Sequence, residues 1–233
     1  MKHNRDYYIF GYPIDTAIGK CYPLLVKDIP EYFSDLSLMS LNRYQIVDDL
    51  MKNNPPHLHH ELSTLYQESL FNLYKNLPFL HEPYNKVFRK VFDNESIIDF
   101  INEGTFNKIR TLVIEMNGRP EEPEVGNPEL RMFDEWGKQA KASDEPVSIE
   151  DILSSVAFEK KITYSQLFEY PLYQLFSTYA RIAKSKSHMM TTLFATVAKV
   201  NIEEWNGHID LFKHDDNSMS KSVFTDKTTE IFN

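Results

Sequence analysis

The chain has little glycine, a single cysteine and no long apolar run, and each shortage excludes a class of protein. Seven glycines among 233 residues form no glycine-rich phosphate loop, and the Gly-x-Ser-x-Gly motif of serine hydrolases is absent. One cysteine, Cys21, excludes an intramolecular disulfide and favours a reducing compartment. No apolar run approaches the length of a bilayer span, and the first residues lack a signal-peptide pattern. We therefore expect a cytoplasmic protein with no membrane partner.

Acidic residues outnumber basic ones by 34 to 25, which gives a formal net charge of −9. Nucleic-acid binding needs a concentrated positive patch, and the small cluster of Arg181, Lys184 and Lys186 is explained by a solvated helix face. We therefore expect no nucleic-acid partner. The hydrophobic content of 42% is enough for one sizeable core or two smaller ones.

Residues 1–118 are predicted to form an N-terminal α+β domain. Aromatic and β-branched residues predict two short strands, Tyr7–Phe10 and Lys20–Lys27, with Pro23 favouring an edge position or a bulge. Beyond Pro30 the apolar spacing becomes helical. It predicts short helices around Tyr32–Ser40 and Tyr44–Met51, and a longer one over Leu58–Leu77 that Pro78 and Pro83 bound. It also predicts a helix over Glu95–Glu103 with Asn94 as its cap, and an amphipathic segment over Phe106–Met116.

Residues 119–147 are predicted to form an acidic, proline-rich connector with a short helix inside it. Asn127 as cap and Pro128 in the first turn start a polar helix that runs from Glu129 to about Ala142. Its narrow apolar strip contains Phe133 and Trp136 and is either a contact with the parent domain or a partner site. On its own the strip favours intramolecular docking, because a helix of this length needs tertiary support.

Residues 148–212 are predicted to form a helical C-terminal block. Ser148 opens one helix, and Thr163 with Gln166 forms a capping box for the next. A further helix past Pro171 has one apolar face, made of Leu172, Leu175, Phe176, Tyr179, Ile182 and Ala183. Residues 213–233 are polar and predicted to be mobile. The predicted fold is therefore mainly α with a small N-terminal β element (α+β) and a helical C-terminal block after an acidic connector.

The search for catalytic chemistry gives no arranged acid–base pair. The densest candidate is the run from His57 to Glu61, which contains possible metal ligands but has no matching second cluster elsewhere. A solvated helix start explains this run, and Cys21 is best explained as a small buried hydrophobe. We therefore expect no catalytic residue, no metal and no cofactor, and we expect that the protein is not an enzyme. A metal-dependent hydrolase using the His57–Glu61 cluster is the alternative from another functional class.

Short runs spread over most of the chain resemble a family of phage proteins. They are Gly11–Lys20, Leu25–Asp28, Asn127–Glu129, Ser148–Ile152, Tyr173–Phe176 with Tyr179 and Arg181-Ile182, Thr192–Val197, and Trp205 with His208–Phe212. In these runs the chain resembles the tail assembly chaperones of phages of Gram-positive hosts. The resemblance implies a non-enzymatic assembly factor of the host cytoplasm, a chaperone-like binder of the tape-measure protein and the tail tube protein. A structural tail, baseplate or adaptor component of the virion is the alternative within the phage class.

A binder of this kind needs an exposed apolar surface that covers its partner. Aromatic residues dominate the energetics of protein interfaces, so the expected partner-binding residues are aromatics of the connector and the C-terminal block: Phe133, Trp136, Tyr173, Tyr179 and Trp205. Phe133 and Trp136, on a polar helix, are the expected exposed pair. Tyr179 and Trp205 are the expected members of the core.

Overall fold

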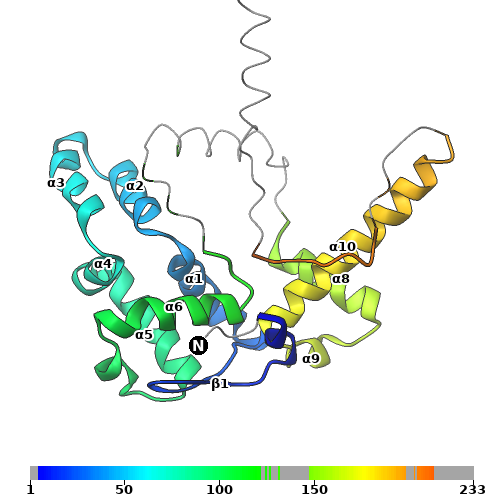
Figure 1. Ribbon diagram of the computed structural model, residues 1–233, viewed down its shortest axis with the longest axis horizontal. Helices are drawn as coiled ribbons and strands as arrows, with labels where there is room; N and C mark the ends of the chain where they lie inside the picture. Colours follow the sequence, from blue (N-terminus) through cyan, green and yellow to red (C-terminus); the bar gives the residue numbers. More distant parts are fainter. Residues whose placement is uncertain are drawn as a thin grey trace, which may run out of the picture. The chain divides into compact units, whose positions relative to one another are not determined.

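The computed structural model describes residues 5–121 and 147–197, together with residues 124, 126, 131, 202 and 204–212. Over these residues the protein is mainly helical, with one two-stranded sheet near the N-terminus, so the predicted fold class is confirmed (Figure 1). Phe133, Trp136 and the predicted mobile tail lie outside the described residues, as does nearly all of the predicted connector helix.

Residues 1–124 and 147–212 belong to one compact unit, and all elements named below are part of it. The division into four segments made from the sequence remains a prediction. In chain order the elements are η1 (Arg5–Phe10), β1 (Ile14–Thr16), β2 (Gly19–Cys21), η2 (Val26–Asp28), α1 (Ile29–Ser40), α2 (Arg43–Asn53), η3 (Pro56–Leu58), α3 (His59–Ser63), η4 (Thr64–Gln67), α4 (Leu70–Asn76), α5 (Pro78–Phe92), η5 (Ile97–Phe100), α6 (Glu103–Met116), α8 (Ile149–Lys160), α9 (Tyr164–Leu167) and α10 (Leu172–Phe194).

The centre of the core is an aromatic cluster where α4, α5 and α6 meet. The ring of Tyr74 stacks on Phe106 with centroids 4.9 Å apart, and Tyr84 and Phe88 pack edge-on against each other. Tyr74 and Tyr84 are nearly inaccessible to solvent, and the Tyr74 hydroxyl donates to Oδ1 of the buried Asn85 at 2.6 Å. Because that polar group is paired, the cluster gains apolar burial without leaving the phenol hydroxyl of Tyr74 unsatisfied.

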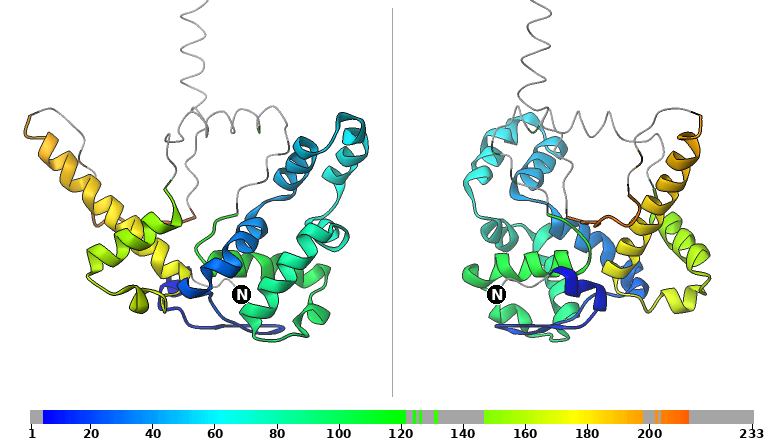
Figure 2. Two further views of the ribbon diagram at one scale, coloured as in Figure 1. Left: turned by 180° about the vertical axis from the view of Figure 1, so that it is seen from behind. Right: turned by 45° about the vertical axis from the view of Figure 1, so that its right-hand side comes forward.

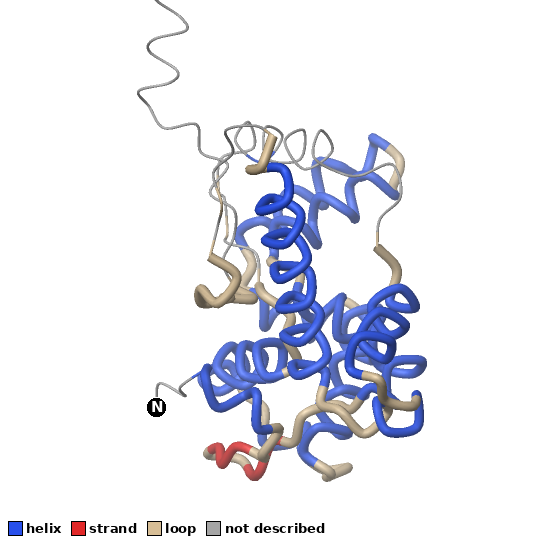
Figure 3. Tube along the Cα trace, turned by 90° about the vertical axis from the view of Figure 1, so that its right-hand side faces the viewer, coloured by secondary structure: helices blue, strands red, loops and turns tan. Residues whose placement is uncertain are grey.

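The N-terminal strands differ from the prediction. Tyr7–Phe10 lies in the 3-10 helix η1, where only Tyr8 is buried, and the second predicted strand is confined to Gly19–Cys21. The sheet is a small antiparallel hairpin in which Ile14 pairs with Cys21 (Figure 3). The Thr16 hydroxyl donates to the Gly19 carbonyl at 2.7 Å and closes the turn. Aromatic residues favour strands mainly where a sheet surface buries them, and in this run only Tyr8 is buried.

Three helix predictions in the middle of the chain were wrong. The long helix over Leu58–Leu77 is broken into η3, α3, η4 and α4. Pro83 lies inside α5, because burial of residues such as Leu80 and Phe88 offsets the one backbone hydrogen bond that proline removes. Within residues 95–103, only Ile97–Phe100 form a helical turn, η5, and Glu103 begins α6. The cap there is Asn102, whose Oδ1 accepts from the Gly104 and Thr105 amides at the start of α6.

The predicted start signals of the C-terminal block are confirmed. The Ser148 hydroxyl accepts from the Asp151 amide at 3.1 Å, and the Thr163 hydroxyl accepts from the Gln166 amide at 3.3 Å. Each side chain satisfies an amide that the first turn leaves without a partner. The helix that follows Thr163 is only α9, and the chain turns again before α10 begins.

A short backbone pairing joins the start of α10 to the N-terminal half of the chain. The Leu172 amide donates to the Leu24 carbonyl at 3.0 Å, and the Val26 amide donates to the Tyr170 carbonyl at 2.8 Å. The buried Asn117 completes this junction, because its Oδ1 accepts from the Leu24 amide at 2.7 Å and its Nδ2 donates to the Val113 carbonyl at 2.8 Å. One side chain directly after α6 therefore fixes the backbone segment to which the start of α10 is hydrogen-bonded.

Replacing Asn117 by alanine is expected to lower the free energy of unfolding by about 2 kcal/mol, because the buried Leu24 amide loses its acceptor. Chemical denaturation of the purified protein measures this. Asn53→Ala, at an exposed position of α2, is the matched control and is expected to change stability by less than about 0.5 kcal/mol. Equal effects of the two substitutions would contradict the role given to Asn117.

Candidate partner-binding surface

The first turns of α10 are held by η1 and by the end of the described chain. Leu172 and Leu175 are buried. The ring of Tyr173 packs edge-on against Tyr8 at 5.6 Å and stacks on Phe212 at 6.1 Å. The Gln174 side chain donates to the Ile9 carbonyl at 2.6 Å. This half of α10 is therefore part of the core, and Tyr173 serves mainly to hold it there.

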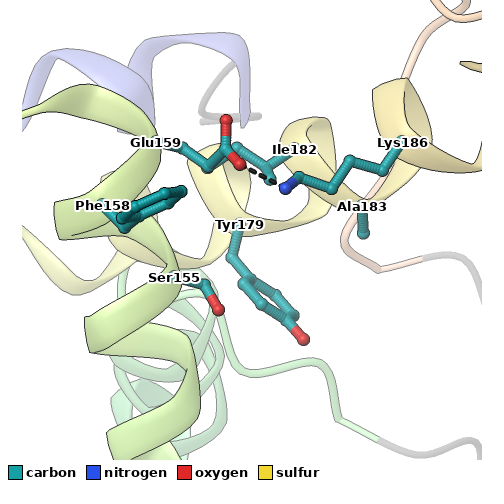
Figure 4. A pocket seen from close by; sticks show the side chains of 7 residues that line it. All are labelled: Ser155, Phe158, Glu159, Tyr179, Ile182, Ala183 and Lys186. Carbon is teal, nitrogen blue, oxygen red and sulfur yellow. Dashed lines mark ion pairs between the residues drawn. The ribbon is translucent and has the colours of Figure 1, made fainter.

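The middle of α10 packs against α8, and the two helices form a shallow groove of about 200 Å³. Figure 4 shows its lining, and the ion pair between Glu159 of α8 and Lys186 of α10 spans the two helices. The lining residues are Ser155, Phe158, Glu159, Tyr179, Ile182, Ala183 and Lys186. Phe158 is 78% exposed although it borders the groove, so an apolar side chain of another molecule has a place to pack.

The same face of α10 continues beyond α8. Residues three and four apart lie on one side of a helix, so the face that carries Tyr179, Ile182 and Lys186 next carries Met189, Met190 and Leu193. We call these six residues the α10 face. Met189, Met190 and Leu193 are 67%, 54% and 64% exposed, and Figures 1 and 2 both show the last turns of α10 extending past α8. The apolar face of α10 therefore extends beyond the part of the helix that packs against α8.

The charge on α10 differs from that of the chain. No Asp or Glu occurs between Leu172 and Val197, whereas Arg181, Lys184 and Lys186 do, in a chain of net charge −9. Arg181 donates to the Trp205 and Gly207 carbonyls at 2.8 and 3.0 Å, and Lys186 pairs with Glu159. These cations hold neighbouring segments of the protein, and the last turns of α10 present apolar rather than charged side chains.

Apart from Tyr173, described above, the aromatic residues proposed from the sequence fall into three groups. Tyr179 is half-buried and packs against the core cluster while lining the groove. Trp205 is 51% exposed, so the expectation that it belongs to the core was wrong. Its carbonyl accepts a hydrogen bond from Arg181, and the residue lies in a turn beyond the end of α10. Phe133 and Trp136 lie outside the described residues, and their role remains a prediction.

Sequence reasoning missed Met189, Met190 and Leu193. The signal was present, because apolar residues recur at helical spacing after Ala183, but the predicted face ended there. Where α8 stops covering this face depends on tertiary packing, and the spacing of apolar residues along one helix does not show it.

The described residues contain no group of three His, Cys, Asp or Glu that is placed to hold a metal ion. In the predicted candidate cluster, Nε2 of His59 lies 3.0 Å from the Asn54 carbonyl, which gives it a structural contact at the start of α3. Among the described helices, none combines the length and the apolar character that a bilayer crossing requires.

Cys21 is fully buried at the end of β2, where its Sγ contacts Sδ of Met116 at 3.3 Å. Burial raises the pKa of its thiol to about 12, since an apolar surrounding disfavours the thiolate. The expected role of Cys21 as a small buried hydrophobe agrees with this environment.

Together these features describe a mainly helical protein in which α10, the longest helix of the described residues, ends in an exposed apolar face. The chain belongs to the YomV family. Residues 2–125 match the family model of the YomV N-terminal domain and residues 138–210 match that of the YomV second domain. The chain is 31% identical over 223 residues to the SPbeta prophage-derived uncharacterized protein YomV of Bacillus subtilis (strain 168), with 94% of each chain covered. No solved structure matches it.

The thiol of Cys21 is expected to resist iodoacetamide at pH 8, because a raised pKa keeps it protonated well above that pH and burial blocks access. Unfolding in guanidinium chloride should restore the reactivity of an ordinary cysteine. Mass spectrometry of the alkylated protein measures both states. Fast modification of the native protein would show that the environment described for Cys21 is wrong.

Replacing Met189 and Leu193 together by serine is expected to change the free energy of unfolding by less than about 0.5 kcal/mol, because both side chains are exposed. Leu175→Ala, in the buried half of the same helix, is the matched comparison and is expected to cost about 3 kcal/mol. Thermal and chemical unfolding measure both. A large loss in the double variant would mean that the α10 face is covered within the protein itself.

Proposed function

We propose that the protein is a non-enzymatic phage tail assembly factor, a chaperone-like binder of the tape-measure and tail tube proteins in the host cytoplasm. Membership of a prophage-derived family supports a phage-related role. The resemblance of the chain to tail assembly chaperones supports the finer assignment. The single observation that carries a binding role is the exposed α10 face.

The α10 face suits a helical apolar partner. A second helix packs on an uncovered helix by fitting its ridges into the grooves between side chains. Two adjacent methionines, Met189 and Met190, add to this because their unbranched, polarisable side chains adapt to different shapes. The groove beside Tyr179 offers an aromatic or aliphatic anchor a defined place. A tape-measure protein, which the family resemblance implies to be long and helical with an apolar stripe, fits this surface.

The size of the surface favours reversible binding. The exposed apolar part of the α10 face is on the order of a few hundred Å², the range of functional patches on monomeric proteins. A stable interface buries roughly 800 Å² on each partner. A chaperone that tail tube subunits must displace needs a weak contact of this kind, repeated along the partner, rather than a permanent one.

The test is co-purification of the phage tape-measure protein with tagged variants of this chain. Met190→Asp combined with Leu193→Asp is expected to reduce recovery about tenfold or more, because a contact on this face would bury two carboxylates against apolar side chains. Tyr12→Asp, at a 74% exposed aromatic outside the α10 face, is the matched control and should bind normally. Full recovery with the double variant, folded by circular dichroism, would exclude the α10 face as the binding surface.

Two further variants separate the remaining hypotheses in the same assay. Phe133→Ala with Trp136→Ala tests the aromatic pair predicted from the sequence, and recovery should fall if that strip contributes. His59→Ala and His60→Ala are expected to retain binding, since neither lies in a group of three metal-binding side chains among the described residues. Loss of function in both histidine variants with the fold intact would favour the metal-dependent hydrolase. Detection of the protein in mature virions would favour a structural component.

A further inference from the structure

Arg119 differs from the other arginines of the chain in its surroundings. Its guanidinium lies 4.1 Å from the centroid of the Phe33 ring and 5.6 Å from that of Phe176. The side chain therefore sits between α1 and α10, directly after α6. Gly118 shapes this arrangement: its φ is +70°, and a Cβ there would lie 3.0 Å from the Phe176 ring, so only glycine lets the ring come this close without strain.

Every other arginine among the described residues has a polar partner. Arg5, Arg43, Arg89 and Arg110 each pair with a carboxylate, and Arg131 and Arg181 donate to backbone carbonyls. For the Arg119 side chain, the described residues supply rings but no carboxylate or carbonyl. Its buried Nε has no hydrogen-bond partner, as is also true of Nε in Arg43 and Arg110, but those two arginines are paired through their terminal nitrogens. Burial lowers the pKa of Arg119. Among the described residues, this guanidinium therefore has no counter-charge.

A half-buried cation without a counter-charge loses part of its hydration, and no ion pair offsets this desolvation cost. The two rings compensate in part through cation–π contact, and they also fix the plane of the guanidinium. A planar guanidinium held this way is prepared for bidentate pairing with a carboxylate, and such a pair gains strength where water is partly excluded. The surroundings of Arg119 therefore favour the binding of an anion with carboxylate geometry.

We propose that Arg119, together with Phe33 and Phe176, is a receptor for an Asp or Glu side chain of a protein partner. The two rings give the methylene groups of that residue an apolar contact while the guanidinium takes the charge. An Asp or Glu side chain fits better than a small acid without methylene groups, because the Phe33 and Phe176 rings lie beside the guanidinium and can pack against those groups. The inference rests on the proposed function only in taking the ligand from a partner protein.

The receptor is tested by nuclear magnetic resonance on the ¹⁵N-labelled full chain. The Nε–Hε signal of Arg119 is assigned by its absence in Arg119→Lys. Two synthetic helical peptides are titrated, identical except for one central residue, Glu in one and Gln in the other, flanked by leucines. The Glu peptide is expected to shift the signal in a saturable way, with the Gln peptide about tenfold weaker, since charge-assisted hydrogen bonds are roughly twice as strong as neutral ones. The Nε–Hε signal of Arg89, already paired with Glu95, should not move.

Equal shifts with both peptides, or no saturable shift with either, would overturn the receptor. A carboxylate of the chain itself is the other occupant to be tested. Arg119→Met keeps the apolar packing and removes the charge. If Arg119 has no carboxylate partner within its own chain, this substitution should leave the free energy of unfolding unchanged or raise it. A clear loss of stability in Arg119→Met that disappears in high salt would overturn the assignment to a partner. Because the peptides do not depend on the tape-measure protein, failure of this test and failure of the co-purification are separate results.

Discussion

The rest of the structure depends on the buried contact that joins Leu24, Asn117 and Leu172. The Asn117 amide holds the Leu24 backbone, and the Leu24 carbonyl accepts the first amide of α10. The start and direction of α10 are therefore set inside the core rather than at the surface. Because the helix is anchored at one end and runs for 23 residues, its last turns reach beyond α8. The uncovered α10 face follows from an anchored helix that is longer than the element packed on it.

Local signals in the sequence predicted those parts of the fold that local chemistry decides. Side-chain caps at Ser148 and Thr163 satisfy nearby amides, so they were visible from spacing alone. The errors lie where tertiary packing overrides a local rule. Pro83 was taken as a helix boundary but lies within α5, where burial of an apolar face outweighs one lost hydrogen bond. The Tyr7–Phe10 run was taken as a strand, yet its backbone is fixed by contacts with α10 that lie far away in sequence.

The candidate site was predictable only in part, and for a related reason. Helical periodicity indicated the apolar face of α10 up to Ala183, and Tyr179 does line the groove. Whether a residue on such a face is covered depends on where a neighbouring helix ends, which periodicity does not contain. Met190 therefore went unnoticed, and Trp205 was assigned to the core although it is exposed. Arg119 gave no signal at all, because its character arises from Phe33 and Phe176 in distant elements.

The central claim is that the last turns of α10 are a surface that a helical partner covers. Amide hydrogen exchange of the full chain, alone and in complex with the phage tape-measure protein, tests it most directly, since exchange reports how often each segment opens to solvent. Residues 186–194 are expected to exchange readily in the free protein and to become protected in the complex. Protection elsewhere in the chain, with residues 186–194 unchanged in a complex that forms, would contradict it.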